Sequence, residues 1–185
     1  MAQSPGPILV TGANSGIGKA ITQCLSERGH AVYATARRTS DFGVFTSLPG
    51  VTPLKLDVTI ESEILQAVQE IRKRQLGLYG LVNNAGIADI VPTIDSSVDD
   101  LARVMDVNLY GIHRMVRALF PFLRESRGRI INISSINGVA PYEFGAAYSS
   151  SKFAVEAYSE VLRMELSELG IKCARSSPAA SGAQL

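Results

Sequence analysis

The stretch TGANSGIG, residues 11–18, lies between a short apolar run and a helical pattern in this chain of 185 residues. Its three glycines are Gly12, Gly16 and Gly18. Glycine allows a sharp backbone turn, and the N-terminus of the helix that follows offers free N–H groups to anionic oxygens. A glycine-rich turn in this context predicts that the backbone holds the pyrophosphate of a dinucleotide.

A P-loop that binds nucleoside triphosphates is the alternative for such a turn. It would require a glycine at Ala13 and a serine or threonine at Ala20, and the sequence has neither. We therefore expect dinucleotide binding, with contacts from the residues of the turn: Gly12, Asn14, Ser15, Gly16, Ile17 and Gly18.

Short apolar runs and helical patterns alternate along the chain. The apolar runs cover residues 7–11, 31–36, 51–56, 78–82 and 129–133. The helical patterns cover residues 18–28, 61–74, 98–123 and 146–169, and the third could be two helices that meet near Asn108. This alternation predicts an α/β fold, a Rossmann-type doubly wound parallel sheet with helices on both faces.

Composition and charge exclude several classes of protein. Hydrophobic residues make up 46% of the chain, too many for a disordered protein, and a net charge of +1 gives no basis for nucleic-acid binding. Cys24 and Cys173 form neither a disulfide framework nor a metal cluster. The N-terminus lacks a signal-peptide pattern, and no apolar segment is long enough to span a membrane. We therefore expect a cytoplasmic protein.

Further motifs follow the glycine turn. The sequence NNAG, residues 83–86, comes after the fourth apolar run, and Asn108, Ser135, Tyr148 and Lys152 come later in that order. Together these motifs resemble the short-chain dehydrogenase/reductase family, and the match extends over about residues 7–172. Stretches such as VYATARR are most similar to the branch acting on steroids, retinoids and similar apolar alcohols. A reductase of fatty-acyl or other small carbonyls is the second option.

The resemblance implies roles in cofactor binding. The glycine turn would hold the pyrophosphate, and Asp57 would meet the adenine. Asn83 would brace the central strands beside the cofactor, with Ala85 and Gly86 at the cofactor itself. Tyr148 and Lys152 would also lie against it.

The end of the second apolar run indicates which nicotinamide cofactor is used. Enzymes that prefer NAD carry an acidic residue here that binds the ribose 2′-hydroxyl, but this chain has Ala36. Arg37 and Arg38 follow, and a guanidinium can bind a phosphate through two parallel hydrogen bonds. We therefore predict NADP(H) rather than NAD(H), with Arg37 as the main contact and Arg38 as a second one.

Tyr148 and Lys152 share one face of a helix because they are one helical turn apart. A free tyrosine is a poor proton donor or acceptor near neutral pH. An ammonium about 4 Å away favours a phenolate by about 4 kcal/mol at an effective dielectric constant near 20. One lysine on the same face is therefore sufficient in magnitude to activate the tyrosine.

The family resemblance implies an oxidoreductase mechanism for these residues. Tyr148 would act as general acid or base while a hydride passes between NADP(H) and an alcohol or carbonyl. Ser135, rather than Ser134, would hold the substrate oxygen, and Asn108 would anchor a water that relays protons to Lys152. The resemblance also implies a homo-oligomer formed through the two long helices, near residues 107–123 and 146–169.

Other chemistries have less support in the sequence. No G-x-S-x-G motif indicates a hydrolase. His30 and His113 are far apart in the sequence, and we expect one in a turn and the other on a helix face, without catalytic or metal-binding roles.

The C-terminal residues differ from the family pattern. We divide the chain into a binding and catalytic domain, residues 1–172, and an atypical polar tail, residues 173–185. Arg175, Ser176 and Ser177 replace a buried apolar strand, and Ala179 after Pro178 replaces a glycine. We therefore expect a truncated family member whose C-terminal strands are incomplete and whose sheet ends at the fifth strand. The alternative function is a catalytically weak or inactive chain that retains cofactor binding or dimerisation.

Overall fold

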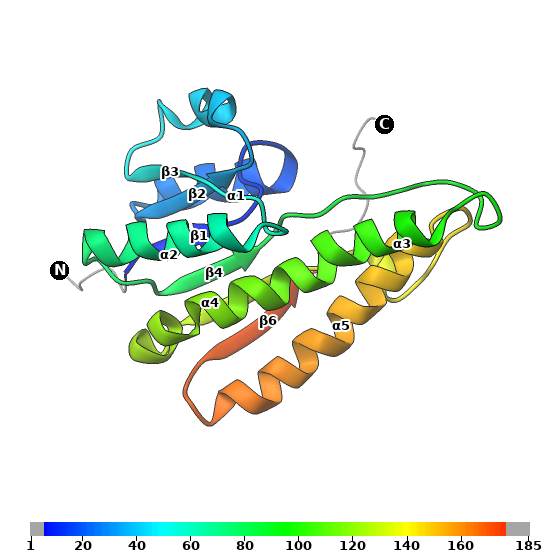
Figure 1. The fold of residues 1–185 in the computed structure, drawn as a ribbon. Helices are drawn as coiled ribbons and strands as arrows, with labels where there is room; N and C mark the ends of the chain where they lie inside the picture. The colour runs from blue at the N-terminus through cyan, green and yellow to red at the C-terminus, as the bar shows by residue number, and fades with distance from the viewer. Residues whose placement is uncertain (1–5, 177–185) are drawn as a thin grey trace.

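The computed structural model describes residues 6–176, which form one sheet of six strands in the order β3-β2-β1-β4-β5-β6 (Figure 1). The strands are β1 Ile8–Val10, β2 Val32–Ala36, β3 Val51–Lys55, β4 Gly80–Asn83, β5 Arg129–Ile133 and β6 Lys172–Ser176. Every neighbouring pair is parallel. The predicted doubly wound parallel sheet is confirmed. Its strand order reverses between β1 and β4, which leaves a crevice at the carboxyl ends of these strands.

Helices connect the strands. The described residues form the α-helices α1 Gly16–Glu27, α2 Glu61–Arg74, α3 Val98–Met105, α4 Gly111–Ser126 and α5 Ala146–Ser167. Short 3₁₀ turns occupy η1, Thr39–Phe45, and η3, Ile136–Gly138, and a π-helical turn occupies η2, Asp106–Tyr110.

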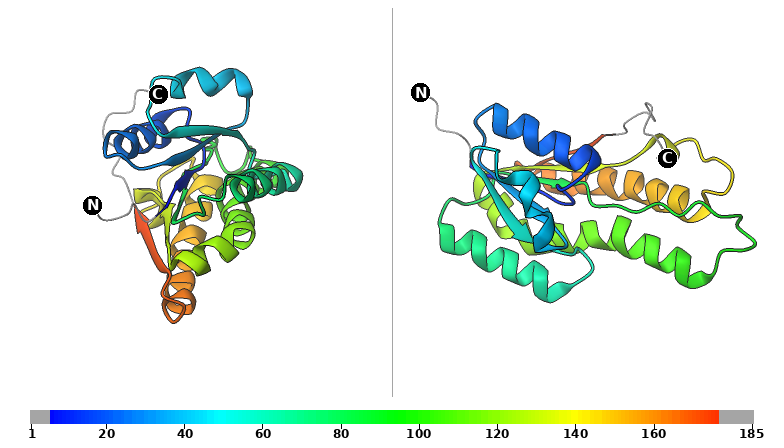
Figure 2. Two further views of the ribbon diagram at one scale, coloured as in Figure 1. Left: turned by 90° about the vertical axis from the view of Figure 1, so that its left-hand side faces the viewer. Right: turned by 90° about the horizontal axis from the view of Figure 1, so that it is seen from above.

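The helices cover both faces of the sheet (Figure 2). On one face α2, α4 and α5 pack around a large core that includes Ile71, Leu119 and Val155. On the other face α1 and η1 pack on a smaller core around Val10 and Ala34. Because β2 is buried along its whole length, its side chains contribute to both cores.

Two elements have the bounds that the sequence predicts. Helix α2 covers Glu61–Arg74, with acidic residues in its first turn and basic residues in its last. These charges complement the helix dipole and mark both ends in the sequence. Strand β5 covers Arg129–Ile133, an apolar run that follows Gly128.

The expectation that the sheet ends at the fifth strand is wrong. β6 pairs with β5 from Lys172 to Ser176, so the strand extends past the predicted boundary at residue 172. It is an edge strand on which Cys173 is buried while Arg175 and Ser176 are exposed. The expected cost of burying polar groups therefore does not arise, and main-chain pairing needs no apolar side chain. Ser177, Pro178 and Ala179 lie outside the described residues.

The long helical pattern of residues 98–123 is divided near Asn108, one of the two possibilities that the sequence leaves open. The π-helical turn η2 separates α3 from α4, and Asn108 is buried within it. Such turns inside helices are frequent at functional sites. Helix α4 begins at Gly111, where its backbone packs closely against Val58. A Cβ at Gly111 would lie 2.6 Å from Cγ2 of Val58.

Within residues 6–176, no helix has the length and apolarity required to cross a membrane. The same residues contain no group of three or more His, Cys, Asp or Glu side chains arranged to hold a metal ion.

Candidate cofactor and active site

A cavity of about 1090 Å³ opens at the crevice beside the carboxyl ends of β1 and β4. Most of the residues predicted to bind the cofactor line it: Gly12, Asn14, Ser15, Gly16, Ile17, Arg37, Arg38, Asp57, Ala85 and Gly86. Gly18 and Asn83 are buried behind its wall instead. The structure thus brings together residues from four separate loops at one opening.

The glycine turn has the conformation and the tight packing that require glycine. Gly12 and Gly16 have φ angles of +61° and +50°, in the left-handed region that glycine adopts without steric cost. A Cβ on Gly18 would lie 2.3 Å from the carbonyl oxygen of Gly12 and 2.4 Å from Nδ2 of Asn84. These close contacts hold the start of α1 against the turn.

The N-terminus of α1 presents unpaired N–H groups to the cavity. Its N-cap residue, Ser15, makes no side-chain hydrogen bond to the helix, and the first turn carries no acidic residue. Ser15, Gly16 and Ile17 line the cavity at this point. An anion placed here would gain both hydrogen bonds and a favourable interaction with the helix dipole.

Asn84, which the sequence reading did not select as a site residue, joins the NNAG motif to the glycine turn. Its Nδ2 donates to the carbonyl oxygens of Thr11 and Gly12, at 2.9 and 3.0 Å. In return, Oγ1 of Thr11 accepts from the backbone N–H groups of Asn84 and Ala85, both at 2.9 Å. Both motifs are visible in the sequence, but the contact between them joins residues more than 70 positions apart and so cannot be inferred from either motif alone.

The η1 turn after β2 brings an acidic residue to the cavity that was not predicted from the sequence. Asp41 accepts hydrogen bonds from Asn14 Nδ2, at 3.2 Å, and from Nε and NH2 of Arg38, at 3.4 and 3.3 Å. Arg37 is exposed and forms no salt bridge with any residue between 6 and 176. Of the two predicted arginines, Arg37 is therefore the one whose guanidinium is available.

Asp57 lies at the cavity wall just after β3. Its Oδ1 accepts from the backbone N and Oγ1 of Thr59, at 2.9 and 2.7 Å. Its own N–H donates to Oε2 of Glu63, at 2.8 Å. These bonds fix the loop before α2, and contact with an adenine stays a prediction.

A buried row of polar side chains crosses the sheet behind the cavity. Asn83 and Asn132 are register partners in β4 and β5, and Nδ2 of Asn83 donates to Oδ1 of Asn132 at 2.8 Å. Nδ2 of Asn132 donates to Oγ of Ser159 at 2.9 Å, and Ser159 donates to the carbonyl of Val155 at 2.6 Å. Asn83 thus links β4 to β5, and the row of hydrogen bonds continues to α5, while a role of Asn83 beside the cofactor stays a prediction.

Tyr148 and Lys152 lie on one face of α5, with the Lys152 ammonium 5.6 Å from the centre of the Tyr148 ring. Lys152 is 5% exposed, and its Nζ donates to the carbonyl oxygen of Ile133 at 2.8 Å. Burial lowers the pKa of Lys152 to about 8, while the Glu156 carboxylate acts in the opposite direction. Lys152 also reaches the cavity wall, because a Cβ on Gly86 would lie 3.8 Å from Nζ.

Asn108 joins this helix to the loop after β4. Its Nδ2 donates to the carbonyl of Ile87 and to Oγ of Ser151, both at 2.9 Å, and its Oδ1 accepts from the N–H of Ile87 at 2.8 Å. Oδ1 would lie 3.3 Å from a Cβ on Gly86. Asn108 therefore positions the stretch that carries Gly86, and both of its amide hydrogens are used in doing so.

The two serines at the end of β5 have different surroundings. Ser134 is buried, and its Oγ has no hydrogen-bond partner among residues 6–176. Ser135 is partly exposed, and its Oγ accepts from the N–H of Asn137 at 3.2 Å as the N-cap of η3. No residue between 6 and 176 accepts a hydrogen bond from the Ser135 hydroxyl, and Ser135 is the more accessible of the two serines.

The histidines lie away from these residues. His113 is exposed on α4, where its Nδ1 is 2.9 Å from the Tyr158 hydroxyl of α5. Burial raises the pKa of Tyr158 to about 12, so the Tyr158 hydroxyl in this hydrogen bond is neutral near pH 7. His30 precedes β2 and is partly exposed.

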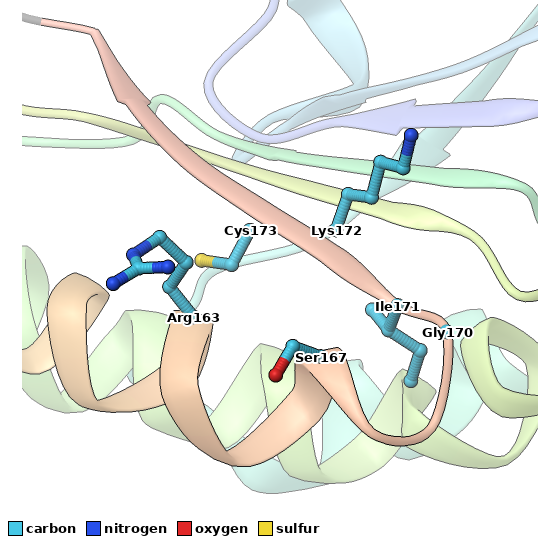
Figure 3. Close-up of a pocket in the computed structure, with 6 residues that line it drawn as sticks. All are labelled: Arg163, Ser167, Gly170, Ile171, Lys172 and Cys173. Atoms are coloured by element: carbon cyan, nitrogen blue, oxygen red, sulfur yellow. The ribbon is translucent and has the colours of Figure 1, made fainter.

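A second cavity, of about 360 Å³, lies between the end of α5 and β6 (Figure 3). Arg163 and Cys173 point toward one another across it, and Lys172 points away from the helix. Burial raises the pKa of the Cys173 thiol to about 11, so the thiol is neutral near pH 7. No predicted site residue lines this cavity. Figure 3 thus shows packing at the sheet edge rather than a part of the candidate site.

The comparison with known families agrees with this geometry. A family model described as short chain dehydrogenase matches residues 7–184. The chain belongs to the short-chain dehydrogenase family. The resemblance inferred from the glycine turn, the NNAG motif and the Asn-Ser-Tyr-Lys set is thereby confirmed.

Relatives within this family include several named reductases and dehydrogenases. The chain is 41% identical over 167 residues to an NADPH-dependent 1-acyldihydroxyacetone phosphate reductase of Schizosaccharomyces pombe, covering 89% of this chain and 56% of the relative. It is 37% identical over 179 residues to human retinol dehydrogenase 16, covering 92% of this chain and 55% of the relative. The chain thus spans little more than half the length of these curated relatives.

A solved structure of the family has the same fold. A short-chain dehydrogenase from Streptomyces avermitilis superposes with a TM-score of 0.89 at 33% identity, covering 96% of this chain and 66% of that one. The superposition confirms the Rossmann-type arrangement of the sheet and helices.

Proposed function

We propose that this chain binds NADP(H) and takes part in hydride transfer between it and a carbonyl or alcohol, with Tyr148 as general acid and base. The observation that carries the proposal is the position of Tyr148 and Lys152. They share one face of α5, and Lys152 borders the large cavity at Gly86. The Lys152 ammonium therefore lies next to Gly86 of the cavity wall, and the proton donor Tyr148 lies beside Lys152 on the same helix face.

The residues around the cavity fit a dinucleotide. The volume of about 1090 Å³ is ample, and the turn at Gly12–Gly18 would hold a pyrophosphate with the free N–H groups of α1. Gly16 leaves open space, since a Cβ there would meet no atom within 4 Å. When bound, the nicotinamide would supply or accept the hydride.

Arg37 supports a preference for NADP(H) over NAD(H). Ala36 ends β2 without a carboxylate, and Arg37 is exposed at the cavity without a salt bridge among the described residues. Arg38 is already bound to Asp41. The yeast relative is also named as an NADPH-dependent reductase. We therefore assign the 2′-phosphate to Arg37, and Arg38 is a secondary contact.

In the direction of reduction, Tyr148 would give its hydroxyl proton to the carbonyl oxygen of the substrate. The Lys152 ammonium would stabilise the phenolate that remains, because opposite charges attract strongly in a partly buried site. Ser135 would donate its free hydroxyl hydrogen to the same substrate oxygen and orient it. Oxidation of an alcohol uses the same groups in reverse.

Asn108 would hold the loop of Gly86 in place for this chemistry. Both amide hydrogens of Asn108 are bonded to Ile87 and Ser151, so the Asn108 amide nitrogen cannot donate to a relay water. A relay water near Lys152 would therefore have to be bound by an oxygen atom. The water itself remains part of the proposal.

An apolar substrate suits the surroundings of Ser135 and Tyr148. The segment between them exposes the large apolar residues Ile136, Val139, Tyr142 and Phe144. The human relative is named as a retinol dehydrogenase, which agrees with an apolar alcohol. We therefore propose an apolar carbonyl or alcohol as the substrate class.

We also propose a homo-oligomer formed through α4 and α5. Helix α5 exposes Phe153, Val161 and Met164, each at least 44% exposed. Sedimentation velocity would measure the association, and Phe153→Asp should shift the protein to the monomer. A monomer at all concentrations in the unchanged protein would contradict the proposed assembly.

The decisive experiment is NADPH turnover on a panel of ketones and aldehydes, with Tyr148→Phe as the matched variant. Turnover that falls at least about a hundredfold in Tyr148→Phe supports the proposal. Cofactor binding without turnover that depends on Tyr148 would instead support a catalytically inactive binding chain. Cofactor preference is tested separately: Arg37→Ala should weaken NADPH but not NADH binding, and Arg38→Ala should do so less.

A further inference from the structure

Charged side chains link Lys152 to the edge strand β6. Arg175 pairs through its Nε with Oε2 of Glu156, which lies one helical turn after Lys152 on α5. Its NH1 also reaches Oε2 of Glu160, at 3.3 Å. Glu160 in turn binds NH2 of Arg163 at 2.6 Å. The network thus connects the strand that follows α5 to the turn of the helix next to Lys152.

Glu156 is the most buried acid of this network. Its side chain is 14% exposed, against 46% for Arg175 and 42% for Glu160. A Cβ on Gly138 would lie 3.0 Å from Cγ of Glu156 and 3.0 Å from the carbonyl oxygen of Lys152. The η3 turn that begins after Ser135 therefore packs directly on the turn of α5 that carries both Lys152 and Glu156, which are four residues apart and share a face of the helix.

Among residues 6–176, Glu156 is the charged group that acts on Lys152. On its own helix Tyr148 lies one turn before it. From β5 it meets the carbonyl of Ile133, and near Gly86 it faces Asn108, neither of which titrates. From β6, Arg175 pairs with Glu156. The charge balance at Lys152 therefore depends mainly on Glu156 and on its partner.

We propose that Glu156 and Arg175 are positioning residues for the proposed reaction: Glu156 keeps Lys152 in its ammonium form, and Arg175 limits how strongly it does so. The proposal rests on the proposed function, because a charged Lys152 is what favours the Tyr148 phenolate. The physical basis is that an anion stabilises a buried cation, whereas a second cation paired with that anion opposes it. The pKa of Lys152, lowered by burial and raised by Glu156, agrees with the sign of this effect.

The test is a direct titration of Lys152 by NMR in protein labelled with ¹³C-lysine, with Lys152→Met to assign the resonance. Glu156→Gln should lower the midpoint of Lys152 by about one pH unit, because it removes the anion and leaves Arg175. Arg175→Met should raise the midpoint by a smaller amount. Glu160→Gln is the matched control, and it should move the midpoint less than either. Lys55, which pairs with Glu63, reports whether the fold is retained.

Opposite shifts in Glu156→Gln and Arg175→Met support the inference, because a role in packing alone gives no such pair of signs. Midpoints that coincide with the unchanged protein, or that move in the same direction, would overturn it. The pH profile of NADPH turnover in the same variants separates the two proposals. If the titration midpoint of Lys152 shifted in opposite directions in the two variants but the protein showed no NADPH turnover, the inference would stand and the proposed function would be rejected.

Discussion

In the glycine turn, one added methyl group at Gly18 would lie 2.3 Å from a backbone oxygen, whereas at the far edge of the sheet Arg175 reaches two carboxylates across a partly exposed surface. The first region is held by close approach of main-chain atoms, with Asn84 filling the remaining space. The second is held by pairs of long charged side chains on α5 and β6. Shape therefore limits substitution in the cofactor half, and charge limits it at the C-terminal edge.

The difference matters for how each region responds to its conditions. Contacts between packed atoms change little with salt or pH, whereas partly exposed ion pairs are screened by salt and depend on protonation. Lys152 lies between the two regions, since it borders the cavity but carries a charge. Because Lys152 carries a charge, its contribution to stability should depend on pH although its side chain is buried.

The largest effect is expected for Gly18→Ala. Its Cβ would meet a backbone oxygen of Gly12, which cannot move without displacing the turn, so we expect a loss of at least about 3 kcal/mol in the free energy of unfolding. NADPH binding should be lost as well. Gly43→Ala is the control, since a Cβ there meets nothing within 4 Å. Urea unfolding measures the stability of both variants. Equal free energies of unfolding for Gly18→Ala and Gly43→Ala would show that the turn can relax.

The next effect concerns the pH dependence at Lys152. The pKa of Lys152 falls from 10.5 to about 8 on folding, so between these values the unfolded chain binds more protons than the folded one. The stability contributed by this group therefore rises with pH across that window. Relative to Lys152→Met, the unchanged protein should gain about 3 kcal/mol between pH 7 and pH 10.5. Urea unfolding at several pH values measures this, and a constant difference would contradict the burial of a charged lysine.

A smaller effect is expected for Asn108→Ala. The change removes three hydrogen bonds and leaves the N–H and carbonyl of Ile87 without their partner, at a cost of about 2 kcal/mol. Ser151→Ala keeps both bonds to Ile87 and should cost less. If Ser151→Ala were as destabilising in urea unfolding as Asn108→Ala, the bonds to the loop would not be the important ones.

The smallest effect is expected for Arg175→Met. Its two ion pairs are partly exposed, so the loss should be less than about 1 kcal/mol and should shrink further in 1 M NaCl. The loss caused by Gly18→Ala should not depend on salt. A salt-independent loss in Arg175→Met would remove the distinction between the two regions.

Motifs and periodicity predicted much of the fold. The bounds of α2 are visible because acidic and basic residues mark its ends, and those of β5 because an apolar run follows Gly128. Ten of the residues that line the cavity are also accessible to sequence reasoning, because they lie in or beside short local motifs, whereas others such as Asp41 are not. The roles of the site residues in catalysis remain predictions.

The remaining features depend on contacts between distant parts of the chain. Arg175 reads as a polar interruption of a strand until α5 brings Glu156 beside it. Asp41 reads as a loop acid until Asn14 is seen to bind it. The burial of Lys152 likewise requires the position of β5, which supplies the carbonyl of Ile133. Such pairings are set by tertiary structure, so local sequence carries little sign of them.

The buried row of Asn83, Asn132 and Ser159 has a consequence for how the chain reaches its fold. The central strands are otherwise apolar, and apolar strands of similar composition can pair in more than one alignment. Because side chains alternate between faces, a slip of one residue between β4 and β5 would separate Asn83 from Asn132 and leave the buried amide of Asn83 without this partner, while Asn132 would keep only its bond to Ser159. The row therefore penalises misaligned intermediates during folding and selects the single alignment in which the carboxyl ends of β4 and β5 meet at the candidate site.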